Sequence, residues 1–122
     1  MSAGIVVFAH GSRVEAANEA VRFVAAELAR AGGFPRVEAA FLELGKPDLD
    51  GAVARLVEEG IQRIVVIPYF LTLGLHLERD LPAIAGRIAR AHPGINLVTT
   101  PPLDGHAGLV QILLDRALAG LK

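Results

Sequence analysis

The chain alternates short runs of apolar residues with longer segments in which apolar residues recur every three or four positions. The apolar runs predict strands at residues 4–9, 36–42, 63–68 and 95–100. The periodic segments predict helices at residues 14–31, 48–60, 80–91 and 107–118. Strands and helices are therefore expected to alternate along the whole chain.

This alternation is typical of an α/β fold with a parallel sheet and right-handed crossover connections. The first and third strands carry the most continuous apolar runs, Ile5–Phe8 and Ile64–Ile67, as expected of strands buried on both faces. We therefore predict a four-stranded parallel sheet with the strand order 2-1-3-4. Residues 1–122 would form a single three-layer domain with helices on both faces of the sheet. In this order the connections reverse between the first and third strands, which predicts a ligand crevice beyond their carboxyl ends.

Local signals mark where the helices begin and end. Ser12 and Asp48 are placed to cap the first and second helices through their side-chain oxygens. Asp80 is expected to cap the third helix, with Pro82 in its first turn, where a missing N–H costs nothing. Residues 69–79 would then form a loop between the third strand and that helix.

Composition narrows the classes of function. Hydrophobic residues make up 52% of the 122 residues, enough for a sizeable core, and the net charge of −1 argues against a nucleic-acid partner. Cysteine is absent, so any metal would bind through nitrogen or oxygen. The sequence shows no basic leader and no apolar run approaching a membrane span of roughly 20 residues, so we expect a cytoplasmic protein with no membrane partner.

Three side chains with useful chemistry are predicted to share the crevice. His10 ends the first strand, His76 lies in the segment that follows the third, and Glu43 ends the second. A histidine at a strand end can be purely structural, but its place before a turn of small residues favours a functional role. His92 and His106 are expected to be structural, at a helix end and a helix start. Two imidazoles and a carboxylate suit cobalt, nickel, iron or zinc.

Two further segments are candidates for binding. Ser12 and Arg13, at a helix start, could hold an anion through backbone N–H groups and the guanidinium, although the glycine spacing of nucleotide-binding motifs is missing. A second segment is too apolar for an ordinary surface loop and is expected to cover a flat apolar ligand or lie in an interface. It consists of Phe70, Leu71, Thr72, Leu73, Gly74 and Leu75.

The motifs at residues 7–13, 40–43, 68–82 and 102–106 resemble the short form of the CbiX/SirB family. These are sirohydrochlorin chelatases, class II enzymes related to ferrochelatase. The resemblance implies ATP-independent insertion of Co²⁺, Ni²⁺ or Fe²⁺ into sirohydrochlorin, on a route to cobalamin or sirohaem. It also implies a homodimer, since short members of the family pair two copies.

The same resemblance implies roles for the candidate residues. His10 and His76 fall on the two active-site histidines, which would bind the metal and accept protons, and Glu43 falls on an acid of the pocket. The metal would be a substrate, with no permanently bound cofactor. The apolar wall for the macrocycle would come from the Phe70–Leu75 segment, and Ser12, Arg13 and Lys46 would hold its carboxylate rim.

Two alternatives remain at this stage. A non-catalytic carrier of a tetrapyrrole or a metal would use the same pocket and the same residues. A phosphate-ester hydrolase could be built on Ser12, Arg13 and His10, although no nucleophile motif supports it.

Overall fold

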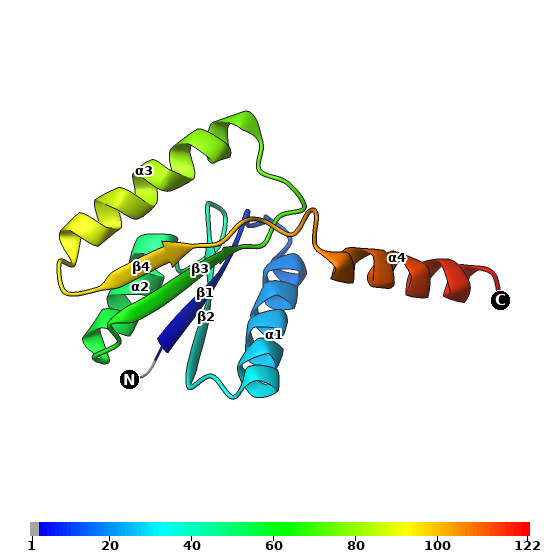
Figure 1. Cartoon of the computed structure of the whole chain (residues 1–122), viewed down its shortest axis with the longest axis horizontal. Coiled ribbons are helices and arrows are strands. Elements are labelled where there is room, and N and C mark those ends of the chain that lie inside the picture. Colours follow the sequence, from blue (N-terminus) through cyan, green and yellow to red (C-terminus); the bar gives the residue numbers. More distant parts are fainter. Residues whose placement is uncertain (1–2) are drawn as a thin grey trace.

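A computed structural model describes residues 3–122 (Figure 1). The strands are β1 (Ala3–Ala9), β2 (Arg36–Phe41), β3 (Arg63–Pro68) and β4 (Asn96–Thr99). The helices are α1 (Glu15–Gly32), α2 (Leu49–Glu58), α3 (Leu75–Ala91) and α4 (Ala107–Gly120). Each strand is followed by a helix, as the sequence pattern predicts.

The four strands form one parallel sheet in the order β2-β1-β3-β4, which confirms the predicted fold class and strand order. β1 is the most deeply buried strand, because it is hydrogen-bonded on both edges and covered on both faces. Its carboxyl end and that of β3 lie at one edge of the sheet, where the chain leaves β1 toward α1 and β3 toward α3.

The larger core lies between the sheet and the two helices α2 and α3. Val6 and Phe8 of β1, with Ile64 and Val66 of β3, provide its floor. The helices contribute residues that are nearly inaccessible to solvent, namely Leu49, Ala52, Val53, Leu56, Leu81 and Ile88. This cluster holds the central strands, and with them the edge of the sheet where His10 lies.

The smaller core lies on the opposite face, under α1. It joins Val7 and Ala9 of β1 and Phe41 of β2 to Val21 and Ala25 of α1. α1 therefore covers the β1–β2 half of this face, and the sheet has helices on both faces as predicted.

The last helix, α4, does not join this layer. It extends away from the sheet (Figure 1), and none of its residues is buried. Although α4 is rich in apolar residues, no helix within residues 3–122 is both long enough and apolar enough to cross a membrane.

The predicted helix caps are partly correct. The Asp48 carboxylate accepts a hydrogen bond from the Gly51 N–H (2.8 Å) and caps α2. The cap predicted for Ser12 is wrong, because Val14 is the residue that precedes α1 and its side chain makes no cap bond. The Ser12 hydroxyl instead accepts a hydrogen bond from the Val14 N–H (3.0 Å) and shapes the turn before the helix.

The predicted start of α3 is also wrong. The helix begins at Leu75 after Gly74, so Asp80 and Pro82 lie inside it rather than at its first turn. The apolar positions Leu77, Leu81, Ile84 and Ile88 repeat at helical spacing and all contact the larger core. Burial of this stripe extends the helix across Pro82, despite the backbone hydrogen bond that proline cannot make.

Removal of a core side chain from α3 provides a direct test of this packing. Leu81→Ala is expected to lower the free energy of unfolding by about 2–5 kcal/mol, because Leu81 is 1% exposed and its loss leaves a cavity. The matched control on the same helix is Arg90→Ala, which should change stability by less than about 0.5 kcal/mol because Arg90 is exposed in the last turn of α3. Urea unfolding measures both, and equal losses would contradict the packing described.

An ion pair joins the two helices of the larger core at the surface. Two guanidinium nitrogens of Arg87 donate to the two carboxylate oxygens of Asp50, at 2.7 and 3.1 Å. These hydrogen bonds are the main reason that the pKa of Asp50 is lowered from its usual value near 3.8. The carboxylate is therefore stabilised in its charged form in the folded protein.

The lowered pKa of Asp50 predicts a pH-dependent contribution to stability. A depressed carboxyl pKa stabilises the fold above the unfolded value and loses that effect as pH falls through the folded value. Asp50→Asn should therefore lower the free energy of unfolding by up to about 1 kcal/mol at pH 7, a small amount because the pair is solvent-exposed. The loss should be the same at pH 5, where the carboxylate is still charged. The difference should disappear as the pH falls below about 3.8, and shrink in 1 M salt. A difference that persists unchanged at pH 3 in urea titrations would contradict this role.

Candidate functional site

His10 and Glu43 meet where β1 and β2 end. Beyond the last strand residues the backbone ladder continues, because the Leu42 N–H donates to the Ala9 carbonyl (2.9 Å) and the Glu43 N–H to the His10 carbonyl (3.1 Å). These two bonds keep the segments that follow β1 and β2 in register beyond the ends of the strands. The His10 Nε2 and the Glu43 Oε1 lie 3.7 Å apart, and both side chains are 58% exposed.

The two ring nitrogens of His10 face different groups. The His10 Nδ1 lies 3.1 Å from the Gly11 carbonyl oxygen, which can only accept a hydrogen bond. The His10 Nε2 lies on the side of the Glu43 carboxylate. In the tautomer that donates from Nδ1 to the Gly11 carbonyl, Nε2 and the carboxylate together offer a place for a cation or a proton at this solvent-accessible edge.

Gly11 makes this close approach possible. Its φ of +93° lies in the region that side chains disfavour, and a Cβ atom there would lie 1.7 Å from the Glu43 carbonyl oxygen. Any larger residue would push the Glu43 loop away from the end of β1. The glycine in the His-Gly-Ser-Arg sequence is thus required by packing against the second strand.

Asn18 ties the two loops of the site together. Its side chain is 1% exposed, and its Oδ1 accepts a hydrogen bond from the Ser12 N–H (2.9 Å). Its Nδ2 donates to the Ser12 carbonyl (2.9 Å) and to the Leu44 carbonyl (3.0 Å). Sequence reasoning missed this residue; the detectable signal was a polar side chain in register with Val21 and Ala25 on the buried side of α1.

His76 lies apart from this pair, in the first turn of α3 rather than in a loop. Its ring is exposed, and its Nδ1 accepts a hydrogen bond from the Arg79 guanidinium (3.3 Å). Within residues 3–122 no three His, Asp or Glu side chains lie close enough together to hold a metal ion. One chain therefore brings His10 and Glu43 together and leaves His76 outside a shared three-ligand cluster.

The apolar segment after β3 is divided between core and surface. Phe70 packs on Phe8, with ring centroids 6.1 Å apart, and Leu73 contacts the larger core. Leu71 is 65% and Leu75 87% exposed, and Thr72 and Gly74 are exposed beside them. Only part of this segment is therefore available to cover a ligand or an interface, because Phe70 and Leu73 anchor it to the fold.

The predicted anion-binding residues take different positions. Ser12 is half-buried and its backbone groups are bonded to Asn18, so its N–H is already occupied. Arg13 is exposed and forms no ion pair in the part of the chain that the structure describes. Of the two side chains, the Arg13 guanidinium is the one free to bind a carboxylate.

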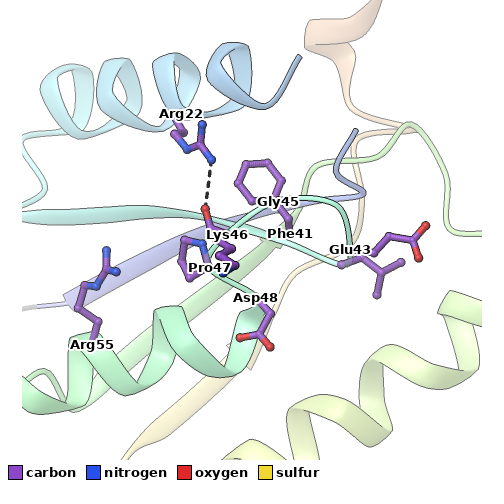
Figure 2. Close-up of a pocket in the computed structure, with 9 residues that line it drawn as sticks. Arg22, Phe41, Glu43, Gly45, Lys46, Pro47, Asp48 and Arg55 are labelled. Carbon is purple, nitrogen blue, oxygen red and sulfur yellow. Dashed lines mark hydrogen bonds between the residues drawn. The ribbon is translucent and has the colours of Figure 1, made fainter. Parts of the chain in front are cut away.

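An open pocket of about 740 Å³ lies beside the Glu43 loop (Figure 2). It is lined by Arg22, Phe41, Leu42, Glu43, Gly45, Lys46, Pro47, Asp48 and Arg55. The Arg22 guanidinium lies 5.2 Å from the centre of the Phe41 ring, donates to the Lys46 carbonyl (3.2 Å), and pairs with Glu15 and Glu19. The hydrogen bond from Arg22 lowers the pKa of Glu15.

The cations of this pocket differ in availability. Arg22 is paired with Glu15 and Glu19, and Arg55 donates to the Glu38 carboxylate at 3.1 Å. Lys46 is exposed and pairs with no carboxylate among residues 3–122. Lys46 and Arg13 are thus the unpaired cations on the two loops that Asn18 connects.

The two remaining histidines have the structural positions that the sequence suggested. His92 follows the last residue of α3, where its backbone N–H bonds to the Ile88 and Ala89 carbonyls. The His106 ring precedes α4, and its Nδ1 accepts a hydrogen bond from the Gly108 N–H (2.8 Å).

Comparisons with known proteins place this fold and site in a family. The model of the CbiX family matches residues 4–119. A chloroplastic sirohydrochlorin ferrochelatase from Arabidopsis thaliana is 34% identical over 113 residues, which cover 93% of this chain and 50% of that protein. A sirohydrochlorin cobaltochelatase from Sulfolobus acidocaldarius is 32% identical over 119 residues, covering 98% and 93% respectively.

A solved structure agrees in three dimensions. The crystal structure of a protein from Marinobacter aquaeolei VT8, described as a cobalamin biosynthesis CbiX protein, superimposes with a TM-score of 0.87 at 28% identity, over 98% of this chain and 97% of that one. This chain thus spans half the length of the plant relative and nearly all of the other two. The resemblance seen in the sequence motifs is confirmed, and the chain belongs to the CbiX family.

Proposed function

We propose that this protein is a sirohydrochlorin chelatase that inserts a divalent metal into the tetrapyrrole without ATP. The observation that carries the proposal is the His10–Glu43 pair, in which Nε2 and Oε1 face each other 3.7 Å apart at an open edge of the sheet. The support from relatives is that the two similar enzymes are a ferrochelatase and a cobaltochelatase acting on sirohydrochlorin. The metal is a substrate here and the protein needs no resident cofactor.

The reaction exchanges one metal dication for two protons of the macrocycle. Two pyrrole N–H bonds break, the metal forms bonds to the ring nitrogens, and the two protons leave on bases of the protein or solvent. In the tautomer that carries its hydrogen on Nδ1, His10 can bind the incoming ion or accept a proton at Nε2, and the Glu43 carboxylate favours either positive charge. Imidazole nitrogen with carboxylate oxygen suits cobalt, nickel or iron, and the choice among them depends on supply.

Other exposed side chains are assigned to the macrocycle. His76 would act as the second imidazole, from the first turn of α3. Leu71 and Leu75, which the fold leaves in solvent, would form an apolar wall for the ring face. Arg13 and Lys46 would hold the carboxylate rim, because neither is neutralised by a carboxylate of the described chain.

We further propose that the protein acts as a homodimer. Within residues 3–122 His76 forms no three-ligand cluster with His10 and Glu43, and Leu71 and Leu75, on the segment that leads into the His76 turn, are exposed. A twofold pairing of site edges would enclose both faces of the tetrapyrrole and cover these side chains.

The proposed activity is tested by spectroscopic turnover. Purified protein, sirohydrochlorin and Co²⁺, Ni²⁺ or Fe²⁺ are mixed, and metal insertion is followed as the absorbance change of the macrocycle. A rate above the protein-free control with at least one metal is expected. Binding of the tetrapyrrole with no acceleration for any metal would overturn the proposal in favour of a carrier that uses the same pocket.

Substitutions in the site should separate the roles of its side chains. His10→Ala and His76→Ala should each reduce kcat/KM by at least about 100-fold, because each removes a metal ligand and proton acceptor. Glu43→Gln should reduce kcat/KM less, by about tenfold, because the substitution keeps the shape of the side chain and removes its negative charge. His92→Ala is the matched control and should leave turnover unchanged, since its ring lies at the other end of α3. Wild-type turnover in both His10→Ala and His76→Ala, at subsaturating metal, would contradict the assignment.

The proposed dimer predicts a link between assembly and turnover. Leu75→Asp should weaken dimerisation and reduce activity together, because it places a charge on an apolar side chain at the site edge. Arg90→Asp, at the exposed far end of the same helix, is the control and should change neither. Sedimentation equilibrium at micromolar concentration measures the mass. A wild-type protein that stays at 12.8 kDa while fully active would contradict the dimer.

A further inference from the structure

α4 is a helix without a partner. Apart from the half-buried Leu109, its large apolar side chains are in solvent: Val110 is 69% exposed, Leu113 67%, and Leu118 55%. Ile112, Leu114 and the adjoining Leu121 are also exposed. A stable surface helix normally buries one apolar stripe against its own domain, and α4 buries none.

The sequence of α4 shows which side would be buried. Val110, Leu113, Leu114, Ala117, Leu118 and Leu121 follow the spacing of three and four residues that forms one continuous stripe. The polar residues Gln111 and Asp115 lie together on another side, where Gln111 donates a hydrogen bond to Asp115 (2.8 Å). This stripe runs from Val110 to Leu121 and is the widest apolar face of the helix, although Leu109 and Ile112 lie outside it.

A matching apolar surface is left open on the sheet. Val65 and Ile67 of β3 pair in register with Ile5 and Val7 of β1, so all four point to the side that α1 covers. α1 reaches β1 and β2 and leaves the β3–β4 half of that side uncovered (Figure 1). Val98 of β4, the register partner of Val65, is 49% exposed there.

The segment between β4 and α4 lies beside this open surface. Residues 100–106, with Ile67, line a largely apolar hollow of about 430 Å³. Parallel sheets are stable when both faces are covered, so a helix is expected over β3 and β4 on this side. Within residues 3–122, α4 is the one helix not packed on the sheet, and it extends away from this surface (Figure 1).

We propose that α4 is exchanged between two copies of this chain, each α4 covering the β3–β4 surface of the other copy. Each copy offers both halves of the contact, an apolar helix and an uncovered sheet face, as a twofold interface requires. The proposal specifies how the proposed homodimer is built, and it does not require that the protein insert a metal.

Crosslinking between two different single-cysteine chains tests the exchange. The sequence contains no cysteine, so each introduced thiol is unique. Val98→Cys is made in an affinity-tagged chain, and Leu113→Cys or Leu114→Cys in an untagged one. The chains are mixed, unfolded and refolded together so that mixed dimers can form, and then treated with a short bis-maleimide. The exchange predicts a covalent product of one tagged and one untagged chain, at several times the yield obtained with Arg116→Cys, whose side chain lies off the apolar stripe.

Two further samples test whether something other than the α4 of a second copy covers the β3–β4 surface. A single chain that carries both Val98→Cys and Leu114→Cys should also give a covalent dimer. An internal crosslink at the mass of one chain would overturn the proposal, because α4 would then fold back on its own sheet. Crosslinking of Leu114→Cys to itself, without any product with Val98→Cys, would also overturn it, because the two α4 helices would then pack on each other.

A charge on the stripe provides an independent measurement. Leu114→Asp should shift sedimentation from twice 12.8 kDa toward 12.8 kDa, with the far-ultraviolet circular dichroism of the domain retained. The Arg116→Asp protein, which carries its new charge off the apolar stripe, should remain dimeric. A dimer unaffected by Leu114→Asp would contradict the exchange. None of these measurements uses metal or tetrapyrrole, so their outcome is separate from that of the turnover assay.

Discussion

The site depends on the continuation of the β1–β2 hydrogen-bond ladder beyond the ends of both strands. The carbonyls of Ala9 and His10 accept from Leu42 and Glu43, which sets the imidazole beside the carboxylate. Gly11 allows the segments after β1 and β2 to approach closely enough for these bonds. Backbone geometry thus fixes the distance between two exposed side chains that have no other support. The same constraint explains why the reactive pair lies at the sheet edge and yet keeps a defined spacing.

Asn18 extends this order from the ladder to the surrounding loops. A buried amide that satisfies both a donor and two acceptors of the backbone resists displacement, because each bond lost would leave a polar group without water. The loops that carry Arg13 and Lys46 are connected through Asn18, which holds the backbone on both sides of the His10–Glu43 pair in one arrangement. A single helix residue on the smaller core therefore organises the approach to the site.

The two faces of the sheet are unequal, and this difference links stability to assembly. α2 and α3 cover their side over the central strands, with Leu56, Leu81 and Ile88 nearly inaccessible to solvent. The α1 side is covered over β1 and β2, while β3, β4 and α4 keep apolar surface in solvent. Burial of that surface between two copies would complete the helical layer on this side of the sheet.

The sequence alone determined the fold class, the strand order and the histidine at the end of β1, because apolar runs and helical periodicity are local patterns. The same patterns also predicted the cap at Asp48 and an end of the first helix at residue 31, one residue before α1 ends at Gly32. Tertiary structure decided the rest. Burial of Leu77 and Leu81 moved the start of α3 to Leu75 and placed Pro82 inside the helix, against its local preference. Three features depend on contacts between residues distant in sequence, which local patterns do not encode. They are the partial burial of the Phe70–Leu75 segment, the hydrogen bonds of Asn18 to two loops, and the outward course of α4.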